Sequence, residues 1–236
     1  MTVKSGLVFC AVLLAGQASA DCTPMPVKGD QDYSVCKEWP AYEGLTLSAY
    51  AHLNPAVADA FGTYDLDVSV LSEGHSAPIV AYHQAAAYTL EGVGLQEIAL
   101  DTARYKLAPD LRAFGVRARF NNASRLNPVE ENQLSLYVRE GAKLRSVLSK
   151  LLVYQYGGEW DGNCAGERFE ITRTVEIAKT NSHGYADLIV KTQQTRTTSV
   201  GEGDACEDKT IMDKPVLTTL RYDGDSYAVP IEFKGL

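Results

Sequence analysis

The chain has 236 residues, of which 45% are hydrophobic and 22% charged, so it is long enough to fold around a substantial core. Its formal net charge is −8 at pH 7, and no run of Lys and Arg occurs along it. This acidity argues against a nucleic-acid-binding protein and against attachment to anionic membrane surfaces. It favours a basic partner, or it serves solubility alone.

Residues 1–20 have the pattern of an export signal. Lys4 gives a positive start, residues 7–14 form an apolar run, and Ala18-Ser19-Ala20 matches the A-x-A cleavage site of signal peptidase. The apolar run is too short to cross a bilayer, which takes about 20 residues. We therefore expect cleavage after Ala20 and a mature protein in the periplasm of a Gram-negative bacterium, or secreted from the cell.

Cysteine usage agrees with export. Cys10 lies in the expected signal, which leaves Cys22, Cys36, Cys164 and Cys206 in the mature chain. An even number of cysteines in an oxidising compartment predicts two disulfides. Of the three possible pairings we favour Cys22 with Cys36 and Cys164 with Cys206, because each closes a loop within its own half of the chain. Without a C-x-x-C spacing or a spare thiol, zinc binding, thioredoxin-like chemistry and a catalytic cysteine have little support.

Short alternations of polar and apolar residues run along most of the chain. They are clearest at residues 64–70 and 133–138, where every second side chain is apolar, as in a half-buried strand. Brief helical turns are expected at Asn54-Pro55 and at Asn127-Pro128. This spacing predicts an all-β fold, either an antiparallel β-sandwich or a partly open β-barrel. Further strands are expected at residues 45–51, 79–84, 95–100, 113–120, 144–148, 168–178, 186–192, 216–222 and 227–233.

The expected domain layout has three parts. Residues 1–20 are the signal, residues 21–44 are an N-terminal segment stapled by a disulfide, and residues 45–236 form one β-rich domain. Within that domain, residues 45–155 and 156–236 are candidate lobes.

Two tight turns, Glu140-Gly141-Ala142-Lys143 and Asp223-Gly224-Asp225-Ser226, each follow a series of expected strands. Two diverged copies of one β unit, at residues 95–148 and 168–230, are therefore a hypothesis.

The segment His183-Gly184-Tyr185-Ala186-Asp187-Leu188-Ile189-Val190, followed by Tyr222-Asp223-Gly224-Asp225-Ser226-Tyr227, resembles a pattern of uncharacterised secreted bacterial β-rich proteins. That pattern is similar to the blade hairpins of FG-GAP-type propellers. The resemblance covers about 45 residues near the C-terminus and implies an exported, β-rich protein. The D-x-D-x-D-G calcium loop of such blades is missing from this segment, so the resemblance implies no metal site.

Gly74-His75-Ser76-Ala77-Pro78 comes close to the G-x-S-x-G nucleophile elbow of serine hydrolases, but Pro78 replaces the last glycine. We expect a plain turn at Glu73-Gly74 instead. His52, His83 and His183 have no metal-ligand spacing, so they are expected to be surface or turn residues.

A disulfide between Cys164 and Cys206 would bring two acidic loops together. Clustered carboxylates beside flexible glycines suit calcium, which takes six to eight oxygen ligands, and could also supply the acid and base of a glycosidase. The third possibility is that these residues form a solvated loop without a ligand. The candidate residues are Glu159, Trp160 and Asp161 in the first loop, and Glu202, Asp204 and Glu207 in the second.

Aromatic residues precede the first acidic loop. Tyr154 and Tyr156 flank Gln155 and are followed by Gly157-Gly158, which predicts aromatic rings next to a flexible turn. Such rings bind proteins and stack on sugars, although they are also ordinary strand residues. Tyr154 and Tyr156 therefore join the candidate binding residues.

Three function classes remain. The first is a non-catalytic binding protein of the envelope, such as an inhibitor or immunity protein against a secreted or envelope hydrolase, with a basic protein as its partner. The second is a periplasmic glycan or ester hydrolase that draws on Ser76 or on Glu159, Asp161, Asp204 and Glu207. The third is a structural envelope protein without a dedicated ligand. We favour the first class.

Overall fold

The computed structural model describes residues 22–55, 61–75, 77–201 and 205–235. The predicted signal and most of the turn expected after Asn54-Pro55 lie outside these residues. In the described part the chain is all-β, and every strand pair is antiparallel. No helix in this part is long and apolar enough to span a membrane.

The first sheet contains four strands in chain order. Each strand pairs with the one before it, so the sheet is a simple meander. The strand Thr63–Ser72 buries every second side chain, as its sequence alternation predicts. The strands are β1 (Tyr33–Glu38), β2 (Leu45–Asn54), β3 (Thr63–Ser72) and β4 (Pro78–Thr89).

The second sheet is larger and has the order β12-β11-β10-β9-β8-β7-β5, with β13 beside β11 and β6 beside β7. Three of its strands are unusually long: β9 has 18 residues, β10 has 17 and β11 has 16. The bounds are β5 (Gly94–Asp101), β6 (Lys106–Ala108), β7 (Leu111–Asn121), β8 (Val129–Glu140), β9 (Lys143–Trp160), β10 (Gly166–Ser182), β11 (Tyr185–Val200), β12 (Glu207–Met212) and β13 (Val216–Leu220).

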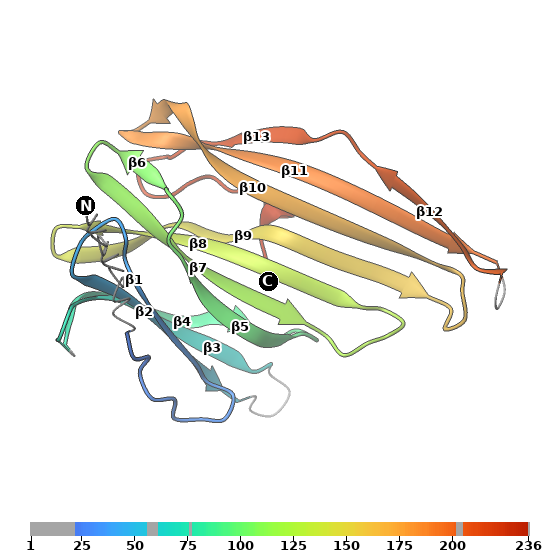
Figure 1. Cartoon of the computed structure of the whole chain (residues 1–236), viewed down its shortest axis with the longest axis horizontal. Coiled ribbons are helices and arrows are strands. Elements are labelled where there is room, and N and C mark those ends of the chain that lie inside the picture. The colour runs from blue at the N-terminus through green and yellow to red at the C-terminus, as the bar shows by residue number, and fades with distance from the viewer. Residues whose placement is uncertain (1–21, 56–60, 76, 202–204, 236) are drawn as a thin grey trace, which may run out of the picture.

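The two sheets pack in layers, as in a β-sandwich. Figure 1 shows β1 to β4 at the bottom, β7 to β9 in the middle and β10, β11 and β13 above them. One core, which includes Trp39, Val68 and Phe114, lies between the first sheet and β5, β7 and β8. A second core, which includes Leu134 and Leu188, joins β8 and β9 to β11, β13 and the C-terminal segment. The predicted all-β sandwich is confirmed.

The ends of the long strands extend beyond these cores, toward the right in Figure 1. Residues 154–160 of β9, 166–172 of β10, 193–200 of β11 and all of β12 pair there in one continuous register. We call these four segments the distal sheet. The boundary between residues 155 and 156, the division between the candidate lobes, passes through β9.

Two expected elements differ from the structure. The helical turn at Asn127-Pro128 is wrong, because the Pro128 carbonyl accepts a hydrogen bond from the Gly158 amide at 3.2 Å and β8 begins at the next residue. The strand at residues 227–233 is also wrong. Tyr227 forms an isolated bridge with Tyr222, and a short 3-10 helix, η2 (Ile231–Phe233), follows Pro230. Proline has no amide hydrogen to donate to a strand ladder, so a ladder is interrupted there.

The predicted tight turns are confirmed. Gly141 has φ 60° in the two-residue turn between β8 and β9, and Gly224 has φ 109° between Tyr222 and Tyr227. Glycine adopts these values without steric cost. The two expected copies share one pairing order, β5-β7-β8 and β10-β11-β13, but β9 has no counterpart strand after β13. The two-copy layout remains a hypothesis.

A buried carboxylate ties the N-terminal segment to the first sheet. Asp32, whose side chain is 2% exposed, accepts hydrogen bonds from the Tyr50 hydroxyl at 2.6 Å, the Gly29 amide at 2.9 Å and the Leu53 amide at 3.0 Å. His52 Nδ1 lies 3.1 Å away. Burial by itself would raise the pKa of Asp32, but these hydrogen bonds together lower it well below its usual value.

We predict that Asp32→Asn lowers the free energy of unfolding at pH 7 by about 2–4 kcal/mol, because a buried ionised acceptor is lost. The folded protein holds Asp32 ionised to a lower pH than the unfolded chain, whose carboxylate has a pKa of about 3.8. The stabilisation is therefore fully present above pH 3.8 and declines as the pH falls below it.

Urea denaturation from pH 2 to pH 7 measures this effect. Asp30→Asn is the matched control, since Asp30 is exposed two positions away. Equal stability of Asp32→Asn and the wild type at pH 7 would contradict the role of this carboxylate.

Candidate functional site

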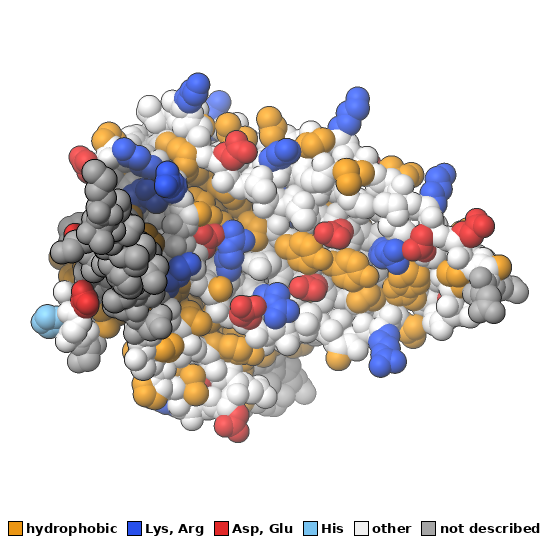
Figure 2. Space-filling model, viewed as in Figure 1, with side chains coloured by type: hydrophobic (Ala, Val, Ile, Leu, Met, Phe, Trp, Pro, Cys, Tyr) orange, Lys and Arg blue, Asp and Glu red, His pale blue; other side chains and the backbone are white. Residues whose placement is uncertain are grey.

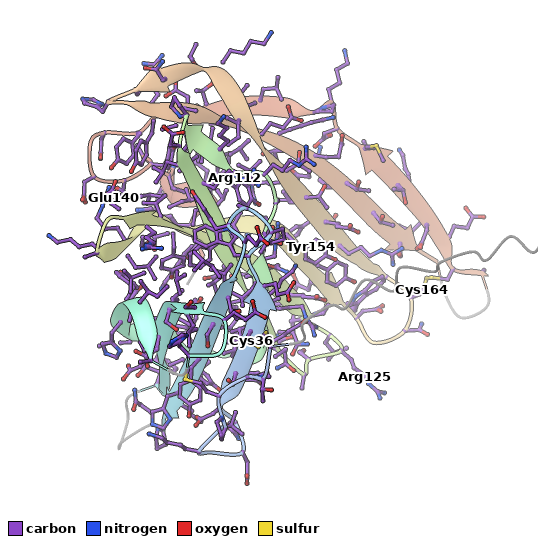
Figure 3. All side chains as sticks on the ribbon, turned by 60° about the vertical axis from the view of Figure 1, so that its left-hand side comes forward. Cys36, Arg112, Arg125, Glu140, Tyr154 and Cys164 are labelled. Carbon is purple, nitrogen blue, oxygen red and sulfur yellow. A yellow bond between two sulfur atoms is a disulfide. The ribbon has the colours of Figure 1, made fainter. Side chains whose placement is uncertain are left out.

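Both predicted disulfides are present. Cys22 is bonded to Cys36, and Cys164 is bonded to Cys206. Figure 3 shows Cys36 in the first sheet and Cys164 at the far end of the long strands, so the two bonds staple opposite parts of the molecule. They indicate an oxidising environment.

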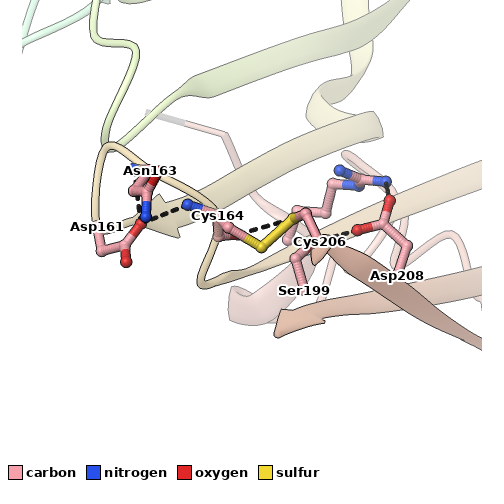
Figure 4. Close-up of a disulfide and its surroundings, with 7 residues drawn as sticks. Asp161, Asn163, Cys164, Ser199, Cys206 and Asp208 are labelled. Atoms are coloured by element: carbon pink, nitrogen blue, oxygen red, sulfur yellow. Dashed lines mark hydrogen bonds and ion pairs between the residues drawn. A yellow bond between two sulfur atoms is a disulfide. The ribbon is translucent and has the colours of Figure 1, made fainter. Parts of the chain in front are cut away.

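The turn at the tip of the distal sheet is held by its own side chains (Figure 4). Asp161 Oδ1 accepts hydrogen bonds from the amides of Asn163 at 2.8 Å and Cys164 at 3.0 Å. The Asp161 carboxylate thus closes the turn before the disulfide, a common role for Asp in loops.

Strand register divides the distal sheet into two faces. Side chains alternate along a strand, and directly paired residues share a face. On β9, Tyr154, Tyr156 and Trp160 therefore lie on one side, which we call the aromatic face, and Glu159 lies on the other. The other residues on this face are Thr172, Glu170 and Arg168 on β10, Gln193, Thr195, Thr197 and Ser199 on β11, and Met212, Thr210 and Asp208 on β12.

A chain of contacts crosses the aromatic face near its tip. The Arg168 guanidinium lies 5.5 Å from the centre of the Trp160 ring, and its Nη2 is 2.7 Å from Asp208. The Ser199 hydroxyl donates to the same carboxylate. The hydrogen bond from Ser199 and then the one from Arg168 lower the pKa of Asp208. The ion pair with Asp208 holds the Arg168 guanidinium over the Trp160 ring.

Two carboxylates flank Tyr156 in the same row of the sheet. Glu130 on β8 and Glu170 on β10 are both paired directly with Tyr156. Burial, followed by the negative charges of Glu170 and Glu130, raises the pKa of the neighbouring Tyr154. Figure 2 shows hydrophobic side chains along the middle of the molecule toward its right-hand end, with acidic and basic groups among them. Rings and carboxylates together suit a surface that packs against apolar groups and attracts positive charge.

The opposite face of the distal sheet carries a shallow hollow of about 740 Å³. Phe169 covers Gly157 there, since a Cβ on Gly157 would lie 2.7 Å from the Phe169 ring. Ile211, which is 49% exposed, also lines the hollow, and its charged lining residues include Glu159, Arg196 and Lys209. Charges of both signs line this hollow, so it selects no single charge.

The structure brings together some of the predicted binding residues. Tyr154, Tyr156 and Trp160 share the aromatic face, whereas Glu159 lies on the opposite face with Glu207, which is paired with Val200. Glu202 and Asp204 lie outside the described residues. Among the residues that are described, no group of three His, Cys, Asp or Glu is arranged to hold a metal ion. The predicted calcium cluster has no geometric support in that part of the chain.

Sequence reasoning did not single out Arg168, Glu170 and Glu130 as binding residues, and it placed Asp208 only in the acidic cluster near the disulfide. They are distant from Tyr156 and Trp160 in sequence and become neighbours only through the pairing of β8, β9, β10, β11 and β12. Alternation within β10 places Arg168 and Glu170 on one face, but the register that aligns them with β9 is set by the fold.

The histidines have structural partners in this fold. His83 Nδ1 is 2.8 Å from Asp67, and His183 Nδ1 is 2.9 Å from the Tyr222 carbonyl. Gly74 has φ 72° in the turn between β3 and β4, so the plain turn expected there is confirmed. Ser76 lies outside the described residues.

Comparison of the chain with protein-family models, with curated proteins and with solved structures gives no match.

The disulfide at the tip yields a stability prediction. Cys164 and Cys206 are 42 positions apart, and closing a loop of this length stabilises a protein by roughly 4 kcal/mol. We expect the double variant Cys164→Ala, Cys206→Ala to lose about that much free energy of unfolding, measured by chemical denaturation. Cys22→Ala, Cys36→Ala, with a separation of 14, should lose about 3 kcal/mol. A tip variant as stable as the wild type would show that the distal sheet is held by its strand pairing alone.

Proposed function

We propose that this chain is an exported, non-catalytic binding protein that holds a basic protein partner on its aromatic face. It would act in the periplasm of a Gram-negative bacterium, as an inhibitor or immunity protein for a secreted or envelope hydrolase. The observation that best supports this proposal is the position of Tyr156, which is paired with Glu130 on β8 and with Glu170 on β10.

The chemistry of this row supports a protein partner. Tyr and Trp bury large areas with little loss of side-chain freedom, and they carry much of the energy of protein interfaces. Carboxylates beside the rings would pair with Lys or Arg of the partner and raise its association rate. The formal net charge of −8 acts in the same direction at longer range.

The setting of the aromatic face also supports binding. The Cys164–Cys206 bond and the Arg168–Asp208 pair hold the distal sheet in one shape before a partner arrives. A surface ordered in advance loses less entropy on association than a flexible one.

Affinity capture tests the proposal. The oxidised protein is incubated with envelope and secreted extracts over a series of salt concentrations, and bound proteins are identified by mass spectrometry. We expect one stoichiometric basic partner that is released as salt rises, because charge pairing is screened by salt. Absence of a partner at every salt concentration would contradict the proposed function.

Variants locate the contact. With the captured partner purified, Tyr156→Ala should weaken its affinity at least tenfold, as expected when a central aromatic contact is removed. Glu170→Gln should weaken binding less and should reduce its salt dependence. Phe169→Ala is the matched control, because Phe169 is an exposed aromatic residue of the same sheet that faces the other way. Binding that depends on Phe169 and not on Tyr156 would move the contact to the opposite face.

A further inference from the structure

A second hollow lies on the outer side of the first sheet, away from the distal sheet. Its volume is about 830 Å³, within the range of small-molecule sites. It is bordered by the Cys22–Cys36 disulfide, by the connection between β1 and β2, and by the turn between β3 and β4. We call it the outer cleft.

Three carboxylates line the outer cleft from three separate parts of the chain. Glu38 ends β1, Glu43 lies in the β1–β2 connection, and Glu73 lies in the β3–β4 turn. None of them forms an ion pair or a side-chain hydrogen bond with another described residue. Lys and Arg are absent from the described lining. The cleft therefore concentrates negative charge that the fold itself does not neutralise.

A buried hydroxyl marks the floor of the same cleft. Ser48 on β2 is 3% exposed, and its Oγ has no hydrogen-bond partner among the described residues. Ser48 is paired with Cys36, and both residues line the cleft, so the hydroxyl lies on the cleft side of the sheet. Leaving a buried polar atom unpaired costs about 1–3 kcal/mol, so such atoms in native proteins require an explanation. A hydrogen bond from an N–H group of a bound ligand would explain the unpaired Ser48 hydroxyl.

The walls between these polar groups are apolar. Leu71 and the exposed Met25 contribute apolar side chains to the lining, whereas the Trp39 ring lies in the core between the sheets, edge to face with Phe114. An aliphatic chain can pack against such walls, while a cationic head reaches the carboxylates.

We propose that the outer cleft binds an aliphatic ammonium group. The charged head would lie among Glu38, Glu43 and Glu73, one of its N–H groups would donate to Ser48 Oγ, and the stem would pack against Met25 and Leu71. The ligand could be a free polyamine or a lysine side chain of another protein, since both offer the same ammonium on an alkyl stem. This site is separate from the aromatic face and does not depend on the function proposed there.

Isothermal titration with hexane-1,6-diamine tests the site on the oxidised protein at low ionic strength. We expect saturable binding of the diamine and none of hexane-1,6-diol, which has the same stem without charge. The triple variant Glu38→Gln, Glu43→Gln, Glu73→Gln should bind the diamine at least tenfold more weakly. The matched control Glu91→Gln, Glu167→Gln, Glu176→Gln removes the same charge from exposed positions elsewhere and should bind within twofold of the wild type.

Ser48→Ala separates binding from folding. Removing an unpaired buried hydroxyl should leave the melting temperature unchanged or raise it, while the affinity for the diamine falls about threefold or more. A parallel titration with acetyl-Ala-Lys-Ala-amide distinguishes the source: tighter binding of this peptide indicates a lysine of a protein, and tighter binding of the diamine indicates a free polyamine. Equal binding of the diol, absence of binding by both cations, or full affinity in the triple cleft variant would overturn the proposal.

Discussion

The arrangement of this protein depends on strands that are longer than its cores. A strand rises about 3.3 Å per residue, so β9, with 18 residues, spans roughly 60 Å. The two hydrophobic cores occupy only the part of that length where other layers cover the sheet. The remaining part, the distal sheet, has neither face packed on another layer, and its edge strand β12 is exposed along all six residues.

A sheet without a core requires other sources of order. Cross-strand pairs contribute only about 0.2–1 kcal/mol each, and a two-sided polar sheet has a weakly specified register. Here the Cys164–Cys206 bond fixes the end of the sheet, and the Arg168–Asp208 pair and the Thr197–Thr210 hydroxyl contact at 3.0 Å cross its strands. Tyr154 and Tyr156 take no part in these contacts and stay partly exposed. The same exposure that costs the sheet stability leaves the proposed binding surface accessible.

The sequence predicted the cores better than the distal sheet, for a physical reason. At residues 64–70 one face of the strand is buried, as the alternation in the sequence predicts. Residues 133–138 also form the predicted strand, but the expected half-burial is wrong, because both faces of this strand are buried between the two cores. In the distal sheet β12 is exposed along its whole length, so no alternation marks it in the sequence, and it was not predicted. Gly157 and Gly158 indicated a flexible turn, but β9 continues through them because the Phe169 ring covers Gly157 and the backbone of β10 lies close to Gly158.

The candidate site shows even more clearly how little of a surface can be predicted from the sequence. Pairing Cys164 with Cys206 followed from loop closure and is confirmed, yet proximity in sequence did not give proximity on a surface. Glu159 and Trp160 are adjacent in the chain, and the pleat of β9 turns them to opposite faces. Tyr156 instead meets Glu170, 14 positions later in the numbering, because the β9–β10 hairpin folds them into one row. Strand register therefore determines which side chains share one face of a sheet. The composition of a loop indicates only which part of the chain to inspect.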